Sequence, residues 1–214
     1  DGSDKIFGLL VTRVGRLYYL YWDGSTLSTT ETIFNRYVNP FDRPTGGLHV
    51  SLDLTQEMMV YTAVDTKPSY RLNDDTGNFT TEYKANASDS GILWMRLASC
   101  PTREEKILAT LDAEGKIKVQ VWSPSDGWTT PLELAQVSFT GATEGEYFRP
   151  FDVAYERNTG RGVIFYADSN IPKYNVWDGN NWIYGSVGQQ FPDIGQVGTP
   201  WWIRAEANPD VNSN

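Results

Sequence analysis

The sequence contains one cysteine and one histidine among its 214 residues, Cys100 and His49. A single cysteine excludes an intrachain disulfide, and the pair is too few for a zinc cluster of cysteine and histidine ligands. A catalytic triad would have to use His49, so the usual nucleophile and base machinery is nearly excluded. No apolar run approaches the roughly 18 residues of a membrane-spanning helix, and we expect no membrane insertion.

Positive charge is also scarce, with 18 lysines and arginines against 27 acidic residues and a net charge of -9. A nucleic-acid-binding surface needs clustered positive charge, so we expect no nucleic-acid partner. The chain begins at Asp1 and shows no signal peptide. We interpret it as a processed product or an excised piece of a longer protein.

Aromatic residues are abundant at 14%, together with 19 glycines and 11 prolines. This mixture is typical of many short strands joined by turns. Alternation of apolar residues in the segment 116–122 supports strand over helix. We therefore expect an all-β protein without a substantial helix, and Cys100 as a small buried residue at a strand end.

The chain repeats itself with a period of about 50 residues. Gly115 precedes Trp122 by seven residues, as Gly15 precedes Trp22, and the Trp-x-Arg pairs at 94–96 and 202–204 each precede a proline at the same distance. The anchor positions lie 51, 49 and 55 residues apart: Trp22, Asn73, Trp122 and Trp177. The spacing predicts four units.

Each unit is predicted to form four strands, as propeller blades do. For the last unit we expect strands over 147–157, 162–168, 173–177 and 182–187. The prediction is one four-bladed β-propeller domain over 1–214, with blades at 201–214 plus 1–40, 41–90, 91–140 and 141–200. Pairing of the N- and C-terminal segments would close the ring and remove exposed edges. A segment of a longer array or an eight-bladed ring is the alternative.

Three segments carry a resemblance: Trp22-Asp-Gly24, the stretch from Trp122 to Trp128, and Trp177-Asp-Gly-Asn-Asn-Trp182. They resemble tandem Trp-Asp-Gly repeats of bacterial extracellular proteins. That resemblance implies propeller blades, an extracellular or cell-surface location, and a recognition or adhesion role without chemistry. The segment beginning at Phe151 and the fourfold count are similar, more weakly, to hemopexin-like four-bladed propellers, although one cysteine cannot form the disulfide that ties those rings.

The first candidate site is a set of basic residues on the predicted innermost strands, one in each unit: His49, Arg96, Arg149 and Arg204. Cationic groups that converge beside a central channel favour an anion or a carboxylate ligand. The alternative is that each arginine pairs with a nearby carboxylate, for which the candidates are Asp53, Asp152 and Glu206.

The second candidate is the set of tryptophans, because sugars stack on flat aromatic faces. At the ends of alternating strands, Trp22, Trp122 and Trp177 are expected to be core residues. The candidates for ligand binding are Trp128, Trp182 and Trp201.

Acidic turns form a third, weaker group: Asp74-Asp75, Asp112, Glu114, Asp126 and Asp178. Oxygen-rich loops can bind Ca²⁺, but none of these has the spacing of a dedicated calcium loop, and Asx turns explain them more simply. We expect no cofactor, with calcium as the only alternative.

The leading functional hypothesis is a non-catalytic module that binds a glycan or a surface protein. The second is a structural subunit of a fibre or sheath that self-associates by strand complementation. The third is a carbohydrate-active enzyme with paired carboxylates. No unique carboxylate pair stands out from the repeat-related acids, and the acids that break the repeat symmetry lie in expected loops: Glu104, Glu105, Glu144 and Glu146.

Overall fold

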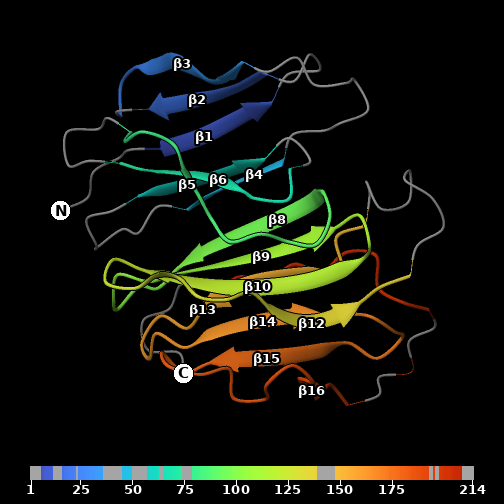
Figure 1. The fold of residues 1–214 in the computed structure, drawn as a ribbon. Helices are drawn as coiled ribbons and strands as arrows, with labels where there is room; N and C mark the ends of the chain where they lie inside the picture. The colour runs from blue at the N-terminus through green and yellow to red at the C-terminus, as the bar shows by residue number, and fades with distance from the viewer. Residues whose placement is uncertain are drawn as a thin grey trace.

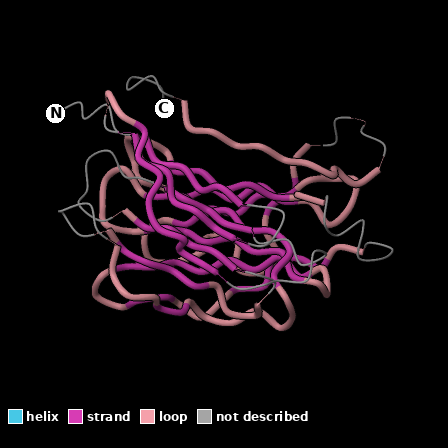
Figure 2. The backbone as a smooth tube through the Cα atoms, turned by 90° about the horizontal axis from the view of Figure 1, so that it is seen from above, coloured by secondary structure: helices cyan, strands magenta, loops and turns pink. Residues whose placement is uncertain are grey.

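A computed structural model describes residues 6–11, 16–22, 24–35, 45–49, 57–62, 65–73, 79–138, 148–192, 195 and 198–208. Over these ranges the chain forms strands, turns and loops and contains no helix (Figure 2). The all-β prediction is confirmed. No helix in the described part of the chain is long and apolar enough to cross a membrane.

The strands form four antiparallel sheets, and each sheet falls within one of the four sequence units. Sheet 1 contains β1 (Ile6–Val11), β2 (Arg16–Trp22) and β3 (Leu27–Asn35). Sheet 2 contains β4 (Thr45–His49), β5 (Met58–Thr62), β6 (Ser69–Leu72) and β7 (Tyr83–Lys84). Sheet 3 contains β8 (Ile92–Ser99), β9 (Lys106–Asp112), β10 (Lys116–Ser123), β11 (Gly127–Trp128) and β12 (Leu132–Gln136). Sheet 4 contains β13 (Phe151–Tyr155), β14 (Gly162–Tyr166), β15 (Lys173–Trp177) and β16 (Gln189–Gln190).

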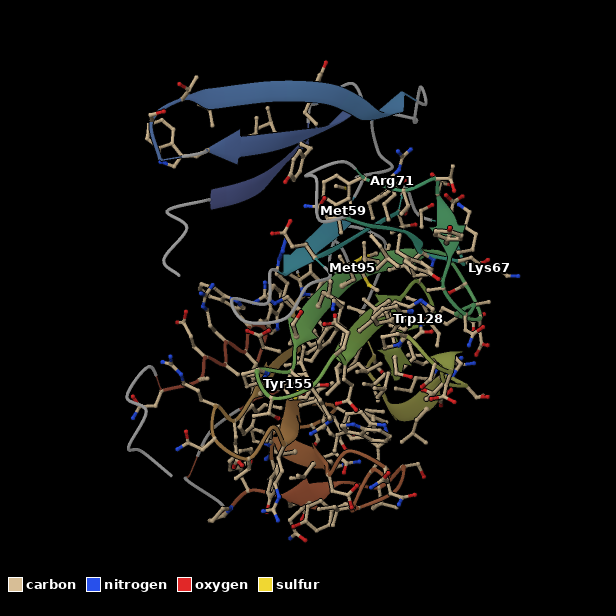
Figure 3. The ribbon with its side chains drawn as sticks, turned by 90° about the vertical axis from the view of Figure 1, so that its left-hand side faces the viewer. Met59, Lys67, Arg71, Met95, Trp128 and Tyr155 are labelled. Atoms are coloured by element: carbon tan, nitrogen blue, oxygen red, sulfur yellow. The ribbon has the colours of Figure 1, made fainter. Side chains whose placement is uncertain are left out.

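The four sheets stack face to face in chain order (Figure 1). The first strands of sheets 2, 3 and 4 lie next to one another, because β4 contacts β8 and β8 contacts β13. Met59, Met95 and Tyr155 mark successive sheets down this stack (Figure 3). We call β4, β8 and β13 the inner strands. Their adjacency is the arrangement that propeller blades adopt around an axis.

Two hydrophobic clusters fill the spaces between these sheets. The cluster between sheets 2 and 3 includes Met58, Met95 and Trp122. The larger cluster between sheets 3 and 4 includes Ile107 and Trp177. Trp122 and Trp177 are 4% and 7% exposed, which confirms their prediction as core residues, whereas Trp22 is half-buried. Cys100 is buried, as expected.

The middle strands of sheet 3 are buried on both faces. All seven residues of β9 are buried, and in β10 the alternating residues Ile117, Val119 and Val121 face sheet 4. The polar residues between them are also covered, since the Gln120 side chain accepts a hydrogen bond from the Asn86 N–H at 3.2 Å and Lys118 lies 2.8 Å from Asp89. The odd-numbered residues of β10 thus form an apolar contact with sheet 4, whereas Lys118 and Gln120 make polar contacts on the opposite face.

The expected strand at 182–187 is wrong, because this segment forms turns after a single bridge between Trp182 and Trp177. The side chain of Asn175 forms hydrogen bonds with the backbone of this segment, in competition with the hydrogen bonds of a fourth strand. Its Oδ1 accepts the Tyr184 N–H at 3.2 Å, and its Nδ2 donates to the Gly185 carbonyl at 2.6 Å. The fourth strand of the sheet is β16, which follows these turns.

The predicted closure between the chain ends is also not what the structure shows. Trp202 forms a parallel bridge with Arg149, immediately before β13, and the described residues place β1 at the edge of sheet 1 with β2 as its strand partner. The Arg149 N–H donates to the Trp201 carbonyl at 2.8 Å, and the Ile203 N–H donates to the Arg149 carbonyl at 3.0 Å. The segment 201–208 therefore continues the row of inner strands beyond sheet 4 and leaves the ring open.

Replacement of Met95 by alanine tests the packing between sheets 2 and 3. Met95 is fully buried, so Met95→Ala is expected to lower the free energy of unfolding by about 2–5 kcal/mol through lost burial and the cavity left behind. Chemical denaturation measures the change. The control Leu27→Ala removes a side chain that is 56% exposed and should change the value by less than about 0.5 kcal/mol.

Candidate functional site

The strand register corrects the predicted ring of basic residues. In sheets 3 and 4 the anchor residue lies opposite the first residue of the second strand, Trp122 opposite Lys106 and Trp177 opposite Gly162. In sheet 2 the Asn73 N–H donates to the carbonyl of Glu57, the residue just before β5. Three residues after these partners, the second strands reach Val60, Ala109 and Phe165. These residues pair with Gly47, Arg96 and Asp152 on the inner strands. Arg96 and Asp152 are therefore equivalent, and the basic residue does not recur at one position.

His49 and Arg149 occupy other positions for this reason. The backbone of His49 pairs with Met58, two residues along β4 from the Arg96-equivalent position, and its side chain lies outside what the structure describes. Arg149 lies three residues before the equivalent position on β13. Counting from tryptophans and prolines aligned the units, but it could not detect this offset, because residue spacing does not show which residues pair across the strands.

Even so, three of the four predicted basic residues meet in one cavity of about 420 Å³. Its walls come from β8, from β13 with the residues just before it, and from the segment 201–204, and its lining residues are Trp94, Arg96, Arg149, Phe151, Asp152, Trp201, Trp202, Ile203 and Arg204. We call this the arginine–tryptophan cavity. Its size is in the range of small-ligand sites, about 300–1,000 Å³.

Asp152 joins the walls of the cavity. Its side chain is 3% exposed and accepts a hydrogen bond from Arg96 Nε at 2.7 Å, across the interface between sheets 3 and 4. Its other oxygen accepts the Ala205 N–H at 2.9 Å, and the first oxygen also accepts the Val153 N–H at 2.9 Å. One carboxylate thus ties together β8, β13 and the C-terminal segment, and Arg96 neutralises its charge.

The other two arginines have different environments. The guanidinium carbon of Arg149 lies 3.8 Å from the centre of the Trp94 ring, a cation–π contact. Arg204 lies 3.6 Å from Glu206 with side-chain exposures of 59% and 78%, so this ion pair contributes little to stability. The predicted pairing with carboxylates is confirmed for Arg96 and Arg204, whereas Asp53 lies outside the described residues.

Of the three tryptophans proposed for ligand binding, the structure places one in the cavity. Trp201 is 59% exposed and packs edge-on against Phe148, while its neighbour Trp202 is 72% exposed. Trp128 packs against Tyr70 on the side of sheet 2, with ring centres 5.7 Å apart, and Trp182 packs against Trp177. Trp128 and Trp182 therefore do not line the cavity that contains the three arginines.

Five residues that line this cavity were not among the residues predicted to bind a ligand: Trp94, Phe151, Asp152, Trp202 and Ile203. A signal was present, because the repeated Trp-x-Arg pair places a tryptophan and an arginine on the same face of a strand at both 94–96 and 202–204. Asp152 was predicted only as a carboxylate partner of an arginine, and its contact with Arg96 depends on the offset of β13 from β8.

The acids considered for catalysis are engaged in separate contacts. Glu104 accepts a hydrogen bond from Lys106 at 2.7 Å, and Glu105 accepts one from Arg103 at 2.7 Å and one from the Tyr155 hydroxyl at 2.8 Å. Burial, followed by the charge of Glu105, raises the pKa of the Tyr155 phenol well above its ordinary value. Glu144 and Glu146 lie outside the described residues.

The acidic turns have local partners. Asp178 Oδ1 accepts the N–H groups of Asn180 and Asn181, both at 2.8 Å, and these bonds lower the pKa of its carboxyl group. Asp126 accepts hydrogen bonds from two serine hydroxyls. The contacts of Asp178 are those of the expected Asx turn, whereas Asp74 and Asp75 lie outside the described residues. The described residues contain no cluster of three metal-ligating side chains.

Replacement of Asp152 by alanine tests its role as the tie between the three walls. Asp152→Ala removes the four hydrogen bonds that the carboxylate accepts and leaves Arg96 without this partner, so we expect a loss of about 1–3 kcal/mol in unfolding free energy, limited by the partial exposure of Arg96. Hydrogen exchange should also become faster at the Ala205 amide. The control Asp126→Ala alters an exposed turn only. Unchanged exchange in 201–208 would contradict this role.

The fold itself is shared with lectins. No family model matches the chain, and no curated protein matches it. Among solved structures it is similar to the SapL1 lectin in complex with alpha methyl fucoside, with a TM-score of 0.58 and 17% identity over 94% of this chain and 64% of the lectin. It is also similar to the BP39L lectin from Burkholderia pseudomallei, with a TM-score of 0.59 and 10% identity over 89% of this chain and 51% of the lectin.

A third similar structure is the fungal lectin from Aleuria aurantia, described as a six-bladed β-propeller with a novel fucose recognition mode. The TM-score is 0.53, and the 12% identity extends over 88% of this chain and 56% of that one. The chain thus spans between about half and two thirds of the length of these lectins. At such low identity the similarity shows the fold alone: the four sheets are arranged as blades of a β-propeller.

Proposed function

We propose that the protein is a non-catalytic, extracellular or cell-surface recognition module that binds a glycan in the arginine–tryptophan cavity. The observation that carries the proposal is the meeting of exposed indole faces with guanidinium groups in one hollow of monosaccharide-to-disaccharide size. Flat aromatic surfaces bury the apolar face of a sugar ring, and nearby polar groups bind its hydroxyls. Lectins with the same fold, one of them bound to a fucoside, support this choice over catalysis.

A glycan array followed by calorimetry with methyl α-fucoside and the best array glycans tests this function. Trp202→Ala removes an aromatic wall of the cavity and is expected to weaken glycan binding at least about tenfold, or about 1.4 kcal/mol. The matched control is Val187→Ala, because Val187 has the same 72% exposure and lies between β15 and β16, outside the cavity. No array signal above background, or equal loss in both variants, would count against the proposal.

A second candidate, a self-associating subunit of a surface fibre or sheath, is favoured by the outer face of sheet 4. The inner face of this sheet is buried against sheet 3, whereas the opposite face carries half-buried apolar side chains, namely Val163, Phe165, Tyr174, Val176 and Phe191. The rings of Phe165 and Phe191 stack with centres 5.8 Å apart. Since successive sheets already pack through such faces, a second copy of this chain is the occupant we propose.

Light scattering over a range of protein concentrations tests this assembly. A self-associating protein should become monomeric on Phe165→Asp, because the substitution places a charge in the apolar contact. Ile183→Asp is the control, since Ile183 is 50% exposed and is absent from the aromatic contacts of that face. A strictly monomeric wild-type protein at high concentration would exclude the candidate.

A further inference from the structure

Sheet 1 has no strand equivalent to the inner strands, among the residues that the structure describes. Trp22 lies opposite Ile6, the first residue of β1, as Trp122 lies opposite Lys106, the first residue of β9. The strands β1 and β2 are therefore equivalent to the second and third strands of sheet 3. In agreement, β4 contacts β1 as β13 contacts β9. The edge of β1 thus lies where an inner strand lies in the other sheets.

The segment 201–208 is an inner strand that lacks a second strand. It continues the row of inner strands through its bridge to Arg149, and within the described chain residues 203–208 join no strand ladder. Its Trp-x-Arg at 202–204 matches the one at 94–96, which belongs to β8 and pairs with β9. The sequence and the place of this segment therefore fit the strand that sheet 1 lacks.

The face of sheet 1 that points away from sheet 2 is apolar. Tyr19 is buried, and its ring centre lies 4.8 Å from that of Phe79 of sheet 2, so the residues next to Tyr19 in β2 point the other way. On that outer face lie half-buried and exposed apolar side chains of β1 and β2, namely Leu10, Tyr18, Leu20 and Trp22. No sheet of the described chain covers them.

Sheet 4, at the other end of the stack, has the surface that would cover this face (Figure 1). Inside the stack, the cluster that contains Trp122 includes two cross-strand pairs of sheet 2, Met58 with Leu72 and Val60 with Tyr70. At the equivalent register positions the outer face of sheet 4 has two apolar pairs, Val163 with Val176 and Phe165 with Tyr174. Sheet 4 therefore resembles the surface that buries an anchor tryptophan, and Trp22 is the anchor that is only half-buried.

From these matches we infer that a second copy of the chain continues the stack head to tail: its sheet 1 packs on the outer face of sheet 4, and the segment 201–208 forms the missing inner strand beside its β1. Two different surfaces meet, so the contact repeats into a ring or a filament. The inference rests on the proposed self-association and names the surface of the second copy that takes part.

The register of β8 on β9 specifies the new strand pair. Arg96 pairs with the residue three positions after the start of β9. The same count from Ile6, the start of β1, places Arg204 of one copy opposite Leu9 of the next. The main-chain hydrogen bonds of this antiparallel pair would add to the apolar contact between the sheets.

Light scattering with two charged variants tests the head-to-tail order. Leu10→Asp places a charge on the outer face of sheet 1, and Phe165→Asp places one on sheet 4, so each variant alone should have the mass of a single chain while the unsubstituted protein assembles. An equimolar mixture should contain dimers of twice that mass, because each variant retains the surface that the other has lost. Ile183→Asp is the control, since Ile183 is 50% exposed, close to the 49% of Leu10, and this variant should assemble normally.

The contrary outcomes are distinguishable. Assembly that Phe165→Asp abolishes and Leu10→Asp leaves intact would overturn the head-to-tail contact and keep sheet 4 as a surface for self-association. An unsubstituted protein that stays monomeric at high concentration would overturn both. The glycan array reports separately on glycan binding, because neither Leu10 nor Phe165 lines the arginine–tryptophan cavity.

Disulfide trapping tests the strand pair. A mixture of Leu9→Cys and Arg204→Cys proteins should form a crosslinked dimer on oxidation, because Cα atoms of opposite residues lie about 4.5–5.5 Å apart, within the range of a disulfide. The control mixture of Leu10→Cys and Arg204→Cys should crosslink much less, since neighbouring strand positions point to opposite faces. The buried Cys100 is common to all these proteins. A disulfide that forms only within single chains carrying both Leu9→Cys and Arg204→Cys would overturn the second copy as the occupant.

Discussion

The structure depends on the packing of twisted sheets against one another through both of their faces. A strand in the middle of such a stack has no side exposed to water, and β9 accordingly buries all seven of its residues. Its odd and even positions serve different interfaces: Ile107 and Leu111 pack toward sheet 4, and Leu108 packs toward sheet 2. Sheet 3 therefore relies on both neighbours for the burial that stabilises it, as in other repeat architectures.

Burial on both faces also brings polar groups inside, where each needs a partner. Asp112 is fully buried and accepts the N–H groups of Glu114 and Lys116 together with the Ser88 hydroxyl. Lys106, 1% exposed, pairs with Glu104 and lies 5.1 Å from the Trp122 ring centre, and burial lowers the pKa of its ammonium group despite that pairing. The buried charged residues Asp112 and Lys106 thus stabilise the fold through these contacts. The pair of Arg96 and Asp152 beside the cavity is a contact of the same kind.

Much of the architecture was predictable, since the period of the tryptophan anchors reflects the spacing of whole sheets. The alternation in 116–122 identified a strand, and the positions of Trp122 and Trp177 identified the core. The site was predictable only in part. Arg96, Arg149 and Arg204 line one cavity, but they do not occupy the equivalent strand positions that the repeat predicted, because backbone register is set by hydrogen bonds that residue counting does not reveal. The turn at 182–187 escaped prediction because one side chain, Asn175, competes there with the ladder.

The walls of the arginine–tryptophan cavity belong to three separately folded pieces of chain, and they meet mainly through Asp152. A molecule that fills the hollow would touch all three and oppose any change in the angle between neighbouring sheets. Occupancy and rigidity are then linked: a ligand that binds only the assembled walls shifts the equilibrium away from partly opened states. The segment 201–208 would respond, because a short parallel bridge to Arg149 and a hydrogen bond to Asp152 attach it at the cavity. Ligand binding in this cavity would therefore stabilise the attachment of the segment 201–208 to the neighbouring sheet.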